Sequence, residues 1–137
     1  MRRPDANFLL LAVALGLLAI PSVALGQAEQ CEKLDESNPE AYRSWKKEIK
    51  AAERLSGRDD FTGAAERYLE AYKICSAPIL EYNLGRMYQQ AGNCRKAINW
   101  YDSVVARQGT DNATVAKLIR LSKNYRSDLE TSCNKLI

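Results

Sequence analysis

Four cysteines are the residues of this 137-residue chain with the most readily anticipated chemistry. They are Cys31, Cys75, Cys94 and Cys133, and no two of them form a Cys-X-X-Cys pair. Because the sequence also contains no histidine, we expect no metal site. If the chain is exported, an even number of cysteines predicts two disulfides, and the sequence alone leaves three ways to pair them.

The other polar residues offer little for catalysis. Asp59 with Asp60, or Glu66 with Glu70, could act as an acid and a base, but carboxylates on exposed helix faces more often serve solubility. No glycine-rich loop is present that could hold a phosphate, and no serine lies in a nucleophile elbow. We therefore expect no catalytic residue, no enzymatic activity and no cofactor.

The N-terminal segment, residues 1–26, has the pattern of a secretory signal peptide. Two early arginines precede an apolar run over residues 8–20, and Pro21 then leads to small residues. Ala24 and Gly26 occupy the third and first positions before a cleavage site, which predicts a mature domain over residues 27–137. The alternative is an uncleaved helix that anchors the protein in the inner membrane.

The charge of the mature chain is nearly balanced. Cleavage removes two of the 20 basic and one of the 17 acidic residues, which leaves a net charge of +2. Nucleic-acid binding usually requires a clustered basic excess, so we expect no nucleic-acid partner. After cleavage we expect no contact with the membrane either.

Helical periodicity extends over most of the mature chain, which predicts an all-α fold. Asn38 and Pro39 start a helix that runs to about Ser56, and Thr62 caps a second helix that ends at Ile74. Three more helices are expected over residues 79–90, 95–107 and 111–132, the last of them capped by Asp111 or Asn112. Glycine and asparagine residues mark the turns between them.

The sequence repeats itself at an offset of 33 residues. This offset aligns small and bulky residues that share one helical face: Ala64 with Ala97, Tyr68 with Tyr101, and Ala71 with Val104. Such a period is typical of proteins built from repeated helix pairs.

The second copy resembles the tetratricopeptide repeat. It contains Leu84-Gly85, then Tyr88, a turn glycine, and Ala97 followed four residues later by Tyr101. The resemblance implies a right-handed array of antiparallel helix pairs, with repeats over residues 45–77 and 78–109 and a capping helix over 111–132. It implies a core formed by Ala64, Tyr68, Ala71, Leu84, Gly85, Tyr88, Ala97, Tyr101 and Val104.

Two other folds remain open. Trp100-Tyr101 and Gly109 are also similar to the Sel1-like repeat, although the turn at Gly92-Asn93 is shorter than those repeats require. An ordinary helical bundle with accidental periodicity is the second alternative.

The geometry of a tetratricopeptide array also implies a disulfide pairing. Helix ends alternate between two edges of such an array, which places Cys31 near Cys75 and Cys94 near Cys133. Each bond closes a long loop and would stabilise so short an array by roughly 4 kcal/mol in the loop-entropy model.

The resemblance further implies a protein-binding function on the concave face, which the first helix of each pair lines. The residues expected there are Lys46, Ile49, Glu53, Tyr82, Asn83, Arg86, Gln89, Gln90, Ala116, Arg120 and Lys123. Their amides and net positive charge suit a protein or an extended peptide with acidic groups.

Small exported proteins of this kind resemble bacterial envelope proteins, so we expect a periplasmic or secreted adaptor. The alternative function is a structural subunit that oligomerises through its C-terminal helix, which has an apolar band at Val115, Leu118, Ile119 and Leu121.

Overall fold

The computed structural model describes residues 26–134, and within this range it consists of helices and turns without any strand. The helices are α1 (Gly26–Ser37), α2 (Pro39–Ser56), α3 (Phe61–Ile74), α4 (Pro78–Gln90), α5 (Cys94–Val105) and α6 (Ala113–Asn134). The fold is therefore all-α. Apart from Gly26, the expected signal peptide lies outside the described residues. No helix between residues 26 and 134 combines the length and the apolar character needed to cross a membrane.

Side-chain caps determine where most of these helices begin. Asn38 Oδ1 accepts a hydrogen bond from the backbone N–H three residues later (3.1 Å), and Asn93 does the same at the start of α5 (3.1 Å). Asn112 caps α6 in the same way. Thr62 was expected to cap α3, and that prediction was wrong. The cap is Asp60, whose Oδ1 accepts a hydrogen bond from the backbone N–H of Gly63 at 2.9 Å, while Thr62 already lies within the first turn.

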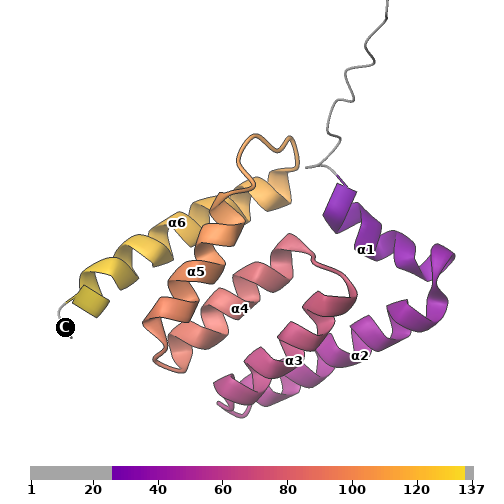
Figure 1. Ribbon diagram of the computed structural model, residues 1–137, viewed down its shortest axis with the longest axis horizontal. Coiled ribbons are helices and arrows are strands. Elements are labelled where there is room, and N and C mark those ends of the chain that lie inside the picture. Colours follow the sequence, from indigo (N-terminus) through magenta and orange to yellow (C-terminus); the bar gives the residue numbers. More distant parts are fainter. Residues whose placement is uncertain (1–25, 135–137) are drawn as a thin grey trace, which may run out of the picture.

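Each helix packs mainly against its neighbours along the chain (Figure 1). The helices α2 and α3 form one antiparallel pair and α4 and α5 form another, while α6 follows as an unpaired helix that contacts both α5 and α4. Helix α1, which the sequence analysis did not expect, packs against the start of this array at α2. The core consequently runs along the array from one helix pair to the next.

The residues that match at the 33-residue offset lie in this core. Eight of the nine expected core residues are buried, and Tyr88 is half-buried against them. The tightest contact joins α4 to α5 at Gly85, where a Cβ atom would lie only 2.6 Å from Cε1 of Tyr101. Glycine is needed at this position because the ring occupies the space of a side chain.

Two disulfides connect parts of the array that are distant in the sequence. Cys31 in α1 is bonded to Cys75 at the end of α3, and Cys94 at the start of α5 is bonded to Cys133 near the end of α6. The Cα atoms are 5.7 and 6.2 Å apart, respectively, within the usual range. These are the two pairs that the repeat resemblance implied, and they indicate an oxidising, exported environment.

Candidate binding surfaces

The polar residues of α4 that were expected to face a partner instead contact other parts of the chain. The guanidinium of Arg86 lies over the ring of Tyr125 in α6, 4.2 Å from its centroid. Gln89 Oε1 accepts hydrogen bonds from Arg86 (3.1 Å) and from the hydroxyl of Tyr101 (2.7 Å). Because α6 packs against α4, these side chains connect two helices within the fold.

Three tyrosines complete this internal cluster. The ring of Tyr82 lies 6.3 Å from that of Tyr101 and 6.4 Å from that of Tyr125, and the last two are stacked at 5.8 Å. Burial raises the pKa of Tyr101 far above its ordinary value, although nearby Arg86 opposes the shift. The cluster thus keeps a neutral phenol in the interior, which favours a structural role.

The remaining residues of the expected concave surface are dispersed. Ile49 packs against the core and Asn83 is half-buried. Six are exposed: Lys46, Glu53, Gln90, Ala116, Arg120 and Lys123. They come from α2, α4 and α6, of which only α4 and α6 pack extensively against one another.

A different site, which we call the apolar hollow, lies where α1, α2, α4 and the start of α6 approach one another. It has a volume of about 340 Å³. Its lining is mostly apolar and consists of Glu32, Trp45, Ala77, Pro78, Ile79, Asn112, Thr114, Val115 and Leu118. Ile79 is 41 % exposed, and it is the exposed large hydrophobic residue of the described part of the chain. One exposed hydrophobic side chain is ordinary, but a hollow with a mostly apolar lining is a candidate interaction site.

The polar groups of the apolar hollow are few. Asn112 is already used, because its side chain accepts from the backbone of the first turn of α6. The indole Nε1–H of Trp45 is buried and has no hydrogen-bond partner among the described residues. Glu32 is the charged residue of the lining. This combination suits an apolar side chain better than an acidic one.

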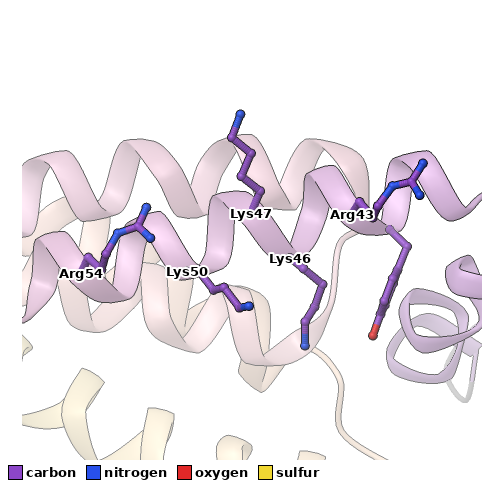
Figure 2. A pocket seen from close by; sticks show the side chains of 6 residues that line it. Arg43, Lys46, Lys47, Lys50 and Arg54 are labelled. Atoms are coloured by element: carbon purple, nitrogen blue, oxygen red, sulfur yellow. The ribbon is translucent and has the colours of Figure 1, made fainter.

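A second candidate surface, the basic stripe, runs along α2. It consists of Arg43, Lys46, Lys47, Lys50 and Arg54, all of them exposed (Figure 2). None of these side chains takes part in the ion pairs found between described residues. The nearest aromatic contact is that of the Lys46 ammonium with the ring of Tyr42, at 5.9 Å.

Sequence reasoning missed most of both surfaces. Of the basic stripe it selected only Lys46, although the spacing of Arg43, Lys47, Lys50 and Arg54 at helical intervals was a readable signal. For the apolar hollow the sequence offered no clear signal, because Ile79 is exposed in a first turn whose other residues, Pro78, Leu80 and Glu81, are buried.

The buried carboxylate of the structure belongs to an internal ion pair. Glu81 is 3 % exposed and accepts from Arg107 at 2.7 and 2.9 Å and from the hydroxyl of Tyr72 at 3.0 Å. Hydrogen bonding to Glu81 raises the pKa of Arg107. Within residues 26–134, no three acidic or cysteine side chains are grouped so that they could hold a metal ion.

Neither protein-family models nor curated proteins nor solved structures match the chain. Because no related protein suggests a function, the functional proposals below rest on the apolar hollow and the basic stripe.

Proposed function

We propose that this protein is a non-catalytic protein-binding module of the cell envelope, an adaptor built as a short tetratricopeptide-type array. The two antiparallel helix pairs, the 33-residue correspondence between them and the close contact of Gly85 with Tyr101 support this type of array. The turn between α4 and α5 spans only residues 91–93, which favours it over a Sel1-like repeat. In this interpretation α6 is the capping helix.

The apolar hollow is the proposed partner site, and its position carries the proposal. In a tetratricopeptide-type array the first helix of each pair lines the concave face, and here Trp45, Ile79 and Leu118 come from α2, α4 and α6, respectively. A volume near 340 Å³ falls in the range of roughly 300 to 1,000 Å³ that is usual for ligand pockets. We infer that a partner inserts an aliphatic or aromatic side chain there.

The partner of this site differs from the acidic peptide expected from the sequence. Glu32 would repel a carboxylate at the rim, and the cations that suggested an acidic ligand lie elsewhere. The Trp45 N–H is buried and offers a partner no accessible donor, which leaves apolar contact as the main attraction of this site. An apolar anchor in a peptide segment satisfies both conditions.

The structural-subunit alternative has less support. Three residues of the apolar band on α6, Val115, Leu118 and Ile119, are buried in a cluster with Val104 of α5. Leu121 is half-buried. The band therefore largely serves the packing of α6 within the chain. Light scattering during size-exclusion chromatography distinguishes the two functions, because the adaptor is expected to be a monomer.

Selection from a random peptide library on the folded, oxidised protein tests the partner site. The selected peptides should share an apolar residue, and Ile79→Asp should weaken them about tenfold or more, since burial of one aliphatic side chain contributes about 1.5 kcal/mol or more. Gln90→Asp is the matched control: it adds the same charge to an exposed site at the other end of α4.

Binding can be followed directly by the fluorescence of Trp45 in a Trp100→Phe background. A selected peptide that occupies the apolar hollow should shift this emission. If selected peptides bind Ile79→Asp as tightly as the parent, or if selection yields no binder, the proposed site is wrong.

A further inference from the structure

The charges of this protein are strongly segregated, although the net charge is small. Between residues 41 and 58, six side chains are basic and only two, Glu48 and Glu53, are acidic. This segment alone has a net charge of +4, more than the +2 of the whole mature chain. Glu48 is in addition paired with Arg67 of α3 at 3.3 Å. The excess of positive charge is thus concentrated on residues 41–58, of which Arg58 lies just beyond α2; α2 itself, with Glu40 in its first turn, has a net charge of +2.

The basic stripe occupies the solvent face of α2 along most of its length. At about 100° per residue, Arg43, Lys47, Lys50 and Arg54 lie within about 60° of one another around the helix axis. Trp45 and Ala52, which are buried, lie on the opposite face. The stripe is about 16 Å long, because its ends are eleven residues apart and each residue rises about 1.5 Å.

The cations of the stripe do not converge on a point. Figure 2 shows Lys46 and Lys47 pointing to opposite sides of α2, with Arg43 and Arg54 near its two ends. The surface between them is lined by Tyr42 and by these basic side chains themselves. Such an arrangement matches a high density of negative charge spread over a surface, and it lacks the shaped pocket that would select one acidic side chain.

We propose that the basic stripe docks this protein on an anionic lipid surface. Lysine and arginine near an anionic leaflet are attracted to it from several ångströms away, and their aliphatic stems can lie against the headgroup region. The ring of Tyr42, half-buried at one end of the stripe, suits the same boundary. No membrane contact after cleavage was expected from the sequence, and the alignment of Arg43, Lys47, Lys50 and Arg54 along one exposed side of α2 is the reason to revise that expectation.

Lipid docking goes beyond the proposed partner binding and is compatible with it. The apolar hollow uses Trp45, from the face of α2 opposite to the stripe. A protein that lies on a membrane through α2 would therefore keep its partner site open to the aqueous side. The combination describes an adaptor held at a membrane surface without a spanning helix.

A vesicle-binding experiment on the oxidised mature chain tests the proposal. Flotation is measured with vesicles of phosphatidylcholine alone and with vesicles that contain about 30 % phosphatidylglycerol, at about 50 mM and about 500 mM salt. We expect binding to the anionic vesicles at low salt, little binding to the neutral ones, and release at high salt.

Two variants that lose the same charges determine whether the stripe is responsible. Lys47→Gln/Arg54→Gln removes two cations of the stripe, and Lys117→Gln/Arg95→Gln removes one lysine and one arginine from exposed sites on α6 and α5. Each cation near the leaflet contributes about a fivefold change, so the stripe variant should bind about 30-fold more weakly. The control should retain its binding.

Three outcomes would overturn the proposal. Equal losses in both variants would mean that net charge alone governs binding, and absence of flotation with anionic vesicles would remove lipid docking directly. If a soluble polyglutamate peptide binds through Lys47 and Arg54 while vesicles do not, the stripe recognises an acidic protein segment instead. Circular dichroism of both variants checks that the helices are intact.

Discussion

Replacing Gly85 with alanine perturbs the contact on which the packing of α4 against α5 depends. The new Cβ atom would lie 2.6 Å from Cε1 and 2.7 Å from Cδ1 of Tyr101, distances that real Cβ atoms do not tolerate. Tyr101 cannot easily move away, because its ring is fully buried and its hydroxyl donates to Gln89 at 2.7 Å. Either the two helices separate or the tyrosine leaves its position.

Two opposing effects determine the magnitude. Alanine is favoured over glycine in a helix interior by about 1 kcal/mol, which would stabilise the variant. Overpacking of a rigid core costs about 1 to 3 kcal/mol, and loss of the hydrogen bond to Gln89 adds about 1 kcal/mol. We expect Gly85→Ala to lower the free energy of unfolding by about 1 to 3 kcal/mol.

Urea denaturation of the oxidised protein measures this change, and a thermal melt should show a Tm lower by at least about 4 °C. Gly57→Ala is the matched control, since its Cβ would contact only backbone oxygens, the nearest at 3.4 Å, and its φ of −66° suits alanine. In a Tyr101→Leu background, where the ring is absent, Gly85→Ala should cost little. A Gly85→Ala variant as stable as the parent would refute this account of the helix packing.

Three further predictions concern other contacts. Glu81→Gln should lower the free energy of unfolding by about 3 kcal/mol, because it removes the buried carboxylate that neutralises Arg107. In urea denaturation, a smaller loss for the double variant Glu81→Gln/Arg107→Gln would support the pairing. Replacing Cys94 and Cys133 with serine should lower the free energy of unfolding by up to about 4 kcal/mol. In the parent protein, a non-reduced peptide map that pairs Cys94 with any cysteine other than Cys133 would contradict the fold. Folding raises the pKa of Tyr101, so as the pH rises the phenol ionises in the unfolded chain first and stays protonated in the folded chain. The free energy of unfolding should therefore fall above about pH 10 and not below it. Tyr101→Phe should reduce that alkaline loss, whereas an unchanged pH dependence in urea titrations would exclude Tyr101 as its source.

Much of the fold could be predicted from local sequence signals. The start of α2 follows from Asn38, which caps the helix, and from Pro39, which suits its first position. Helix α1 was missed because residues 26–37 show only weak apolar periodicity, and its bond from Cys31 to Cys75 is a contact across 44 residues that no local signal predicts. The cap of α3 was misassigned because Asp60 and Thr62 are both competent caps, and only the path of the turn favours the first.

The sequence by itself determined the helical periodicity, the small and bulky residues that meet between helices, and the even set of cysteines. Only the tertiary structure decided which polar faces remain open. Arg86 and Lys50 both occupy polar positions on amphipathic helices, yet Arg86 is covered by Tyr125 while Lys50 is exposed. Periodicity records which face of a helix is apolar. Whether another helix then covers its polar side depends on long-range packing, which here is the contact of α6 with α4.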